Sequence, residues 1–180
     1  LLPVWVAMMI AYRAGLYDRT TLKTGGMKLM VGKVGIATLQ DVGREFADRR
    51  VADDGLMPAT LALLEEDRRQ GARIAIATAA FEFYAAAFAK HLDIDIVIGT
   101  RWDGRSIVGG NCYGETKLAR VRAWAAEQNH QLEDAELRFV SDSFADAPLL
   151  DLAYEPIFIS ASSRKREKAK ARGWRIISAD

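Results

Sequence analysis

Hydrophobic residues recur at helical spacing through the first quarter of the chain. The apolar run Leu1–Ile10 is followed by further residues spaced three or four apart, including Leu22, Ile36 and Phe46. No alternating pattern typical of a strand occurs before about residue 52. The sequence therefore predicts a small helical module here, with breaks or bends at Gly25–Gly26 and at Gly32.

The pattern changes from about Met57 onward. Pro58 suits the first turn of a helix that ends at Gly71, and a second helical stripe begins at Phe81. Short apolar runs between helical stretches predict buried strands, and Asp103–Gly104 predicts a two-residue hairpin turn. The predicted strands are 73–78, 95–98, 137–140 and 157–159, with a candidate fifth at 174–177.

Strands that alternate with helices predict an α/β fold, in which a parallel sheet is covered on both faces. Ligands bind such sheets at the carboxyl ends of the strands. The residues directly after the predicted strands are therefore the first candidates for a functional site. They are Thr78, Gly99–Thr100, Ser141–Asp142–Ser143 and Ser160.

Composition narrows the class of protein further. The 180 residues carry a net charge of only +1, which gives no global attraction for nucleic acid or for an anionic membrane. The basic stretch 164–172 is interpreted as a solvated helix. A single cysteine, Cys112, excludes an internal disulfide and fits a reducing, cytoplasmic compartment. His91 and His130 have no cysteine partners at the spacing of a zinc site.

The apolar N-terminal run is too short to span a bilayer. It has neither the basic segment nor the cleavage site of a signal peptide. Since the chain has no initiator methionine, we expect an internal fragment that begins in a buried helix. No feature of the sequence specifies an oligomeric state.

Three features at the predicted strand ends carry chemistry. Thr78, followed by Ala79 and a predicted helix, could hold a phosphate oxygen or simply cap that helix. Lys117 lies in the first turn of a helix, where a cation is unfavourable unless it pairs with an anion; the alternative is an exposed side chain. Asp142 and Asp146 follow a buried strand, and Asp146 could also cap the helix that contains Pro148.

A carboxylate at the end of a parallel strand suits a hard cation such as Mg²⁺. Together, a hydroxyl, a lysine and a carboxylate at three strand ends indicate phosphoryl transfer.

Three segments resemble the second, third and fourth motifs of the haloacid dehalogenase (HAD) superfamily, in the family's order. They are Ile76–Ala79, Gly114–Lys117 and Ser141–Leu150, and the closest likeness is to the phosphoserine-phosphatase-like branch, subfamily IB. The resemblance implies a Rossmann-like parallel sheet (HAD core) at 56–180 and a small helical cap domain at 1–55.

The resemblance also implies a role for each matching residue. Thr78 and Ala79 would bind phosphate, and Lys117 would neutralise the charge of nucleophile and phosphate. Asp142 would ligate Mg²⁺, and Asp146 would support the metal site. The activity implied is hydrolysis of a small phosphomonoester through an aspartyl-phosphate intermediate. Substrate selection would fall to the cap, whose basic candidates are Arg13, Arg19, Lys23, Lys28 and Lys33.

The first motif of the family, Asp-x-Asp-x-Thr, has no match in this sequence. Asp93-Ile94-Asp95 has Val97 where the threonine is needed. In the family's sheet order the missing strand lies between the strands that end at Thr78 and Ser141. Its absence would leave backbone groups unpaired at about 1–3 kcal/mol each. We therefore expect further sequence upstream, or another segment, to fill the gap and supply the nucleophile; without it the chain should be inactive.

Two other functions are considered. A non-catalytic relative could use the same fold to bind a phosphorylated ligand or a protein partner. A dinucleotide-binding oxidoreductase is disfavoured, because no Gly-x-Gly-x-x-Gly follows a predicted strand.

Overall fold

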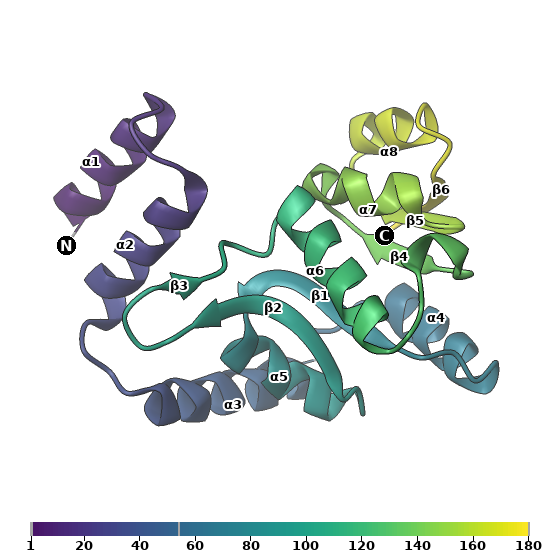
Figure 1. The fold of residues 1–180 in the computed structure, drawn as a ribbon, viewed down its shortest axis with the longest axis horizontal. Coiled ribbons are helices and arrows are strands. Elements are labelled where there is room, and N and C mark those ends of the chain that lie inside the picture. Colours follow the sequence, from purple (N-terminus) through teal and green to yellow (C-terminus); the bar gives the residue numbers. More distant parts are fainter. Residues whose placement is uncertain (1, 54, 180) are drawn as a thin grey trace.

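Helices and strands alternate from Pro58 onward in the computed structural model, which describes residues 2–53 and 55–179 (Figure 1). The helices are α1 (Leu2–Arg13), α2 (Arg19–Val31), α3 (Ile36–Ala52), α4 (Pro58–Arg69), α5 (Glu82–His91), α6 (Glu115–Glu127), α7 (Ala147–Leu152) and α8 (Ser163–Lys170). Short 3₁₀ turns cover Leu132–Asp134 (η1) and Phe144–Asp146 (η2). The strands are β1 (Ala75–Phe81), β2 (Ile96–Trp102), β3 (Ile107–Val108), β4 (Arg138–Ser141), β5 (Glu155–Ile159) and β6 (Arg175–Ile177).

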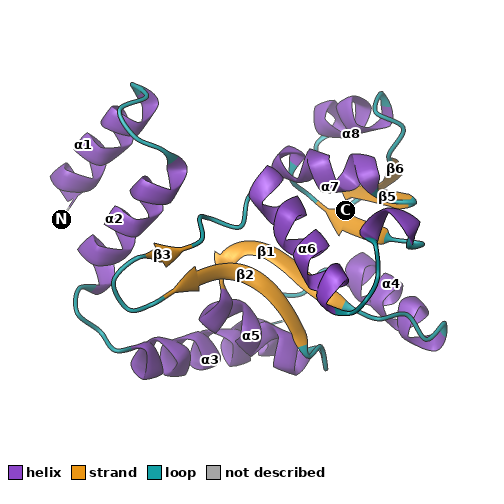
Figure 2. Cartoon of the chain, in the orientation of Figure 1, coloured by secondary structure: helices purple, strands orange, loops and turns teal. Residues whose placement is uncertain are grey.

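The strands form two three-stranded sheets, visible as separate groups in Figure 2. In one sheet β1 pairs with β2 in parallel and β3 joins as an antiparallel hairpin strand. In the other, β4, β5 and β6 are all parallel. The candidate strand at 174–177 is therefore confirmed as β6. The α/β prediction is also confirmed, with the antiparallel β3 as the exception to a purely parallel sheet.

Helix α6 spans both sheets. Its residues Leu118, Val121 and Ala125 are buried in one cluster with Ile98 of β2 and Leu149 of α7. Ala77 of β1 and Phe139 of β4 pack against the same cluster. One hydrophobic cluster therefore contacts both sheets, with β1 and β4 as the strands at their adjoining ends.

Neither β1 nor β4 has a second strand partner among the described residues, because each ends its sheet. All residues of both strands are only partly buried, whereas Ile157 and Phe158 of β5 are fully buried. Central strands of an α/β sheet are normally buried on both faces. The gap expected between the strands near Thr78 and Ser141 is thus present, and we call it the strand gap.

Two local predictions differ from the structure. Strand β1 does not end at Thr78 but continues to Phe81, with an irregular register between Ala77 and Phe81. The hairpin turn also shifts by one residue, since Asp103 N–H donates to the Ser106 carbonyl and the central residues are Gly104 and Arg105. The Asp103 carboxylate fixes this turn by accepting bonds from the N–H groups of Arg105 and Ser106, each at 2.7 Å.

Helix α1 is present but is not the buried helix that we expected. None of its described residues is buried, and Leu2 and Ile10 are 73% and 64% exposed. The helix contacts α2 through Trp5 and Met8, which lie against Gly26 and Gly25. These glycines do not break α2, which runs on to Val31; they allow the two helices to approach closely. A Cβ atom on Gly26 would lie 2.6 Å from the Trp5 ring. The predicted break at Gly32 is confirmed, since Gly32 caps the helix with a positive φ of 66°.

The three N-terminal helices do not pack together as one unit. Helices α1 and α2 form a hairpin that stands away from the sheets, whereas α3 lies along α5 beneath β1 and β2 (Figure 1). Phe46 of α3 stacks near Tyr84 and Phe88 of α5, with ring centroids 5.6 and 6.2 Å apart. Helix α2 nevertheless contacts β1 through Lys23, whose ammonium donates to the Ala79 carbonyl. The domain boundary at residue 55 stays a prediction. Among the described helices, none has the length and apolar character needed to cross a membrane.

Candidate active site

A buried ion pair joins the third and fourth predicted motifs. The Lys117 ammonium lies 2.6 Å from Asp146 Oδ1, and the two residues are 5% and 7% exposed. The second carboxylate oxygen of Asp146 accepts a hydrogen bond from the Ser141 hydroxyl at 2.7 Å. The alternative interpretation of Lys117 as an exposed side chain is therefore wrong. Asp146 is the N-cap residue of α7 by position, but its side chain makes no capping hydrogen bond.

Asp142 lies one residue beyond β4 and is exposed. Its side chain has no hydrogen bond or ion pair to any residue that the structure describes. The neighbouring turn is held without it, because the Ser141 hydroxyl accepts from Ser143 N–H and the Ser143 hydroxyl accepts from Ala145 N–H. The Asp142 carboxylate is therefore available to a ligand at the carboxyl end of β4.

Thr78 lies in an irregular segment of β1. Ala77 pairs with Ile98 and Phe81 pairs with Thr100, so β1 uses four residue steps where β2 uses two. We call residues 78–80 the bulge. The Thr78 hydroxyl oxygen accepts from Ala80 N–H at 3.1 Å, which leaves its proton free to bind a ligand. Thr78 and Ala79 therefore do not sit at a helix start as predicted, since α5 begins only at Glu82.

The loop 109–114 leads from β3 to α6 and contacts both β2 and the turn after β4. At its start, Asn111 Oδ1 lies 2.9 Å from Thr100 Oγ1 of β2, and that hydroxyl lies 2.8 Å from the Ala79 carbonyl. At its end, a Cβ on Gly114 would lie 3.7 Å from the Ala145 carbonyl, beyond β4. The bulge and the Lys117–Asp146 pair therefore lie along one edge of the molecule, on either side of the strand gap.

Arg120 holds this loop in place, a role that the sequence pattern did not indicate. Its guanidinium donates to four backbone carbonyl groups, those of Gly99, Val108, Gly109 and Gly110. Arginine offers five N–H donors in a rigid arrangement, which suits a cluster of carbonyls. Two of the four acceptors belong to Gly109 and Gly110, whose positive φ angles of 67° and 83° favour glycine.

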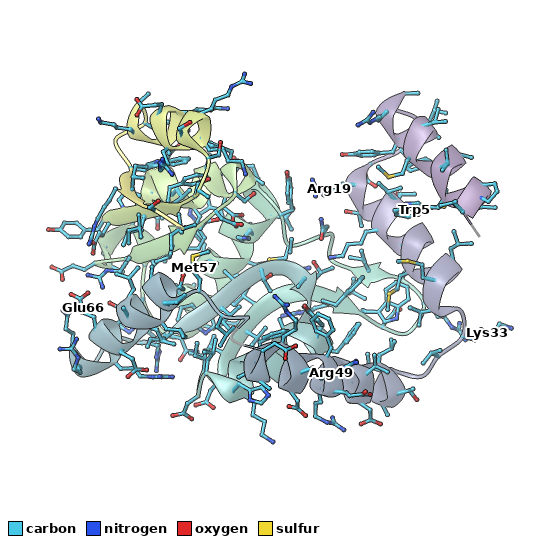
Figure 3. The ribbon with its side chains drawn as sticks, turned by 180° about the vertical axis from the view of Figure 1, so that it is seen from behind. Trp5, Arg19, Lys33, Arg49, Met57 and Glu66 are labelled. Carbon is cyan, nitrogen blue, oxygen red and sulfur yellow. The ribbon has the colours of Figure 1, made fainter. Side chains whose placement is uncertain are left out.

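Helix α2 faces the same edge with three polar residues. Thr20 Oγ1 accepts from Asn111 N–H at 3.2 Å, and the Arg19 guanidinium lies 4.0 Å from the centroid of the Tyr113 ring. Lys23 donates to Ala79, Thr100 and Asn111. Figure 3 shows Arg19 on the side of α2 that faces the sheets, and Lys33, in the loop after α2, pointing away from them. Of the five basic candidates in the predicted cap, the structure thus brings Arg19 and Lys23 to the site.

Partial burial lowers the pKa of Lys23 from its usual 10.5 to about 8. Burial is the largest cause of this lowered pKa; Cys112 opposes it, and the nearby cations Arg19 and Arg120 add to it. Cys112 itself is fully buried, and burial raises the pKa of its thiol.

Two carboxylates, Asp142 and Asp146, lie at this edge beyond β4. Within residues 2–53 and 55–179, no three acidic, histidine or cysteine side chains cluster as metal ligands. Asp146 already uses both oxygens, for Lys117 and Ser141, so of these two carboxylates Asp142 is the one without a side-chain partner among the described residues. Mg²⁺ takes one or two carboxylates together with water and phosphate oxygens. The donor chemistry of Asp142 therefore fits Mg²⁺, and Asp142 is the residue that would hold it.

Asp93 and Asp95 lie at the wrong end of the sheet for catalysis. They precede β2, so both are at the amino end of this strand. Asp93 has a positive φ of 49° in the turn after α5. The interpretation that Asp93-Ile94-Asp95 is not the nucleophile motif is consistent with this position.

Comparison with known proteins agrees with this fold and site. Residues 5–151 match the haloacid dehalogenase-like hydrolase family. The chain belongs to this family, as the motif resemblance predicted.

Three relatives illustrate the relationship. The chain is 26% identical over 148 residues to a histidinol-phosphatase of Neisseria meningitidis, covering 78% of this chain and 66% of that protein. It is 29% identical over 148 residues to the phosphoserine phosphatase SerB1 of Mycobacterium tuberculosis, covering 78% and 47%. A Bordetella pertussis protein of unknown function superposes with a TM-score of 0.80 at 29% identity, covering 97% of this chain and 80% of that one. The chain thus spans about half to two thirds of the length of the curated relatives that it matches.

Proposed function

We propose that the protein is a Mg²⁺-dependent phosphatase that hydrolyses a small-molecule phosphomonoester through an aspartyl-phosphate intermediate. The observation that carries this proposal is the arrangement at one edge: the Thr78 bulge on one side of the strand gap, and Lys117, Asp142 and Asp146 on the other. Relatives named as phosphatases support the general activity. The single cysteine, Cys112, supports a reducing, cytoplasmic setting.

Each residue has a role that its surroundings support. The Thr78 hydroxyl and the backbone at Ala79 would bind phosphate oxygens, since the hydroxyl proton is not used within the bulge. Lys117 would supply positive charge toward the gap, and Asp146 with Ser141 would hold that lysine in place. Asp142 would ligate Mg²⁺. When bound, this cation would screen the electrostatic repulsion between the anionic phosphate and the attacking carboxylate.

The attacking carboxylate would come from the strand gap. Asp146 is committed to Lys117 and Ser141, so it is not a free nucleophile. A strand placed between β1 and β4 would pair their open edges and bring its own carboxyl end between Thr78 and Asp142. We propose that a segment outside residues 1–180 supplies this strand and the Asp-x-Asp-x-Thr motif.

The chemistry then has two steps. The first aspartate of the motif would attack phosphorus as the bond to the ester oxygen breaks, and the second would give its proton to the departing alcohol. That second aspartate would next take a proton from water, whose oxygen attacks the aspartyl phosphate. The products are the alcohol and inorganic phosphate, and both aspartates return to their starting state.

The alternative is a non-catalytic protein that binds a phosphorylated ligand or a protein partner. One observation favours it for residues 1–180 taken alone: Asp146 is committed to Lys117 and Ser141, and no cluster of three acidic, histidine or cysteine side chains occurs among the described residues. The phosphate-binding groups are common to both candidate functions. The presence or absence of a nucleophile in the strand gap therefore distinguishes a phosphatase from a binding protein.

Phosphate release from an aryl phosphate with Mg²⁺ tests the proposal. The comparison is between the chain of residues 1–180 and the protein as expressed from its natural gene, whose N-terminus and intact mass are determined first. We expect turnover only where Asp-x-Asp-x-Thr is present. Binding of inorganic phosphate without turnover in a protein that lacks the motif would support the non-catalytic alternative instead.

A further inference from the structure

Lys23 connects the α1–α2 hairpin to the phosphate-binding bulge, across 56 residues of sequence. Its ammonium donates to the Ala79 carbonyl, to Thr100 Oγ1 at 3.1 Å and to Asn111 Oδ1 at 3.0 Å. It also lies 4.2 Å from the centroid of the Phe81 ring, so it touches β1 on both sides of Ala80. An ammonium has three N–H donors, and all three are used here.

The acceptors around Lys23 cannot be satisfied without it. The Thr100 hydroxyl has one proton and lies 2.8 Å from the Ala79 carbonyl and 2.9 Å from Asn111 Oδ1, so it can serve only one of them. Thr100 and Asn111 are 0% and 6% exposed, which leaves water little access. Removing Lys23 therefore leaves one acceptor unpaired in a buried place, which favours a rearrangement of the bulge.

We propose that Lys23 is a positioning residue: it fixes the bulge 78–80 from the cap and so holds the Thr78 hydroxyl where it meets the phosphate. The inference rests on the proposed phosphatase function. Because all its donors are occupied, Lys23 does not bind the substrate itself. Docking of helix α2 and the shape of the phosphate site are thereby linked, with Thr20 and Arg19 adding contacts to the loop 111–113.

The test uses Lys23→Cys in the full-length protein, before and after aminoethylation of the new thiol. Aminoethylation restores an amine at almost the length of lysine, and the native Cys112 is buried, so it is protected. Wild type treated with the same reagent is the control for modification elsewhere. Lys28→Cys is the matched control variant, since Lys28 is exposed on the same helix.

The first measurement is kcat and KM for an aryl phosphate, corrected for the folded fraction. We expect Lys23→Cys to lose about 10- to 100-fold in kcat/KM, the scale of a misplaced binding group, and aminoethylation to recover most of the loss. Lys28→Cys should keep the wild-type value. A variant that lowers only the melting temperature, with kcat/KM of the folded protein unchanged, would overturn the positioning role.

The second measurement does not depend on turnover. Hydrogen exchange at the Ala80 amide, which bonds to Thr78 Oγ1, should become at least about tenfold faster in Lys23→Cys and return on aminoethylation. Unchanged exchange overturns the inference even if the protein is an active phosphatase. Conversely, the absence of Mg²⁺-dependent turnover in the wild-type protein would contradict the proposed function. In that case, faster exchange in Lys23→Cys would establish only the contact between α2 and the bulge.

Discussion

The Lys117 ammonium and the Asp146 carboxylate meet 2.6 Å apart in the interior, and their contact joins α6 to the turn after β4. Lys117 is in the first turn of α6, where the helix dipole disfavours a cation. The carboxylate at 2.6 Å offsets that cost. The pair fixes the position of the Lys117 ammonium beside the strand gap.

Removal of one partner should destabilise the protein strongly. Lys117→Met leaves the Asp146 carboxylate buried without its cation, and we expect a loss of about 3–5 kcal/mol in the free energy of unfolding, measured with urea. The control is Glu45→Gln, which removes an exposed pair with Arg49 at 3.6 Å and should cause no measurable change. A loss below about 1 kcal/mol for Lys117→Met would mean that the pair behaves as a surface pair.

A methyl group at Gly99 should disturb the bulge from the side of β2. A Cβ there would lie 2.8 Å from Glu82 Cγ and 3.2 Å from the Ala80 carbonyl. We expect Gly99→Ala to cost about 1–3 kcal/mol by overpacking and to weaken binding of inorganic phosphate, measured by calorimetry. Gly35→Ala is the control, since a Cβ at Gly35 meets nothing within 4 Å and its φ of −66° is ordinary. Equal phosphate affinity in both variants would contradict the link between Gly99 and the bulge.

The charge of Lys23 should change within an accessible pH range. Burial lowers its pKa to about 8 in the folded protein, with Arg19 and Arg120 as the nearby cations, whereas the unfolded chain holds the proton to about 10.5. Between these values the unfolded state binds more protons, so the contribution of Lys23 to the free energy of unfolding should rise as pH increases.

Two measurements check this titration. An NMR resonance that is absent from Lys23→Met should titrate near pH 8. The difference in unfolding free energy between wild type and Lys23→Met should grow in favour of wild type from pH 8 to 10.5. A resonance that titrates above pH 10 would contradict the burial of this ammonium.

The sequence predicted the sheet and half of the site because both depend on local patterns. Short apolar runs between helical stripes specify buried parallel strands, and all five predicted strands are found. Lys117 could be singled out because a cation at a helix start needs a local reason. The absence of a strand between β1 and β4 was also predictable, since the family resemblance supplied the expected strand order.

The rest depends on contacts between distant segments. The bulge at Thr78 needs Thr100 and Lys23, which lie 22 residues downstream and 55 upstream in the printed sequence. Gly25 and Gly26 were interpreted as breaks or bends, since glycine lowers helix propensity, but in the structure α2 runs through them and they pack against Met8 and Trp5. The hydrophobic periodicity of one helix does not indicate which residues of another helix will pack against it.

Phosphate release by Asp142→Asn in the full-length protein tests the central claim most directly. The Asp142 side chain is exposed and bonds to no other described residue, so this substitution should leave the unfolding free energy within about 0.5 kcal/mol of wild type. We expect Mg²⁺-dependent turnover of an aryl phosphate to fall at least about 100-fold, since the metal would lose its ligand. Wild-type turnover in the folded Asp142→Asn protein would contradict the account.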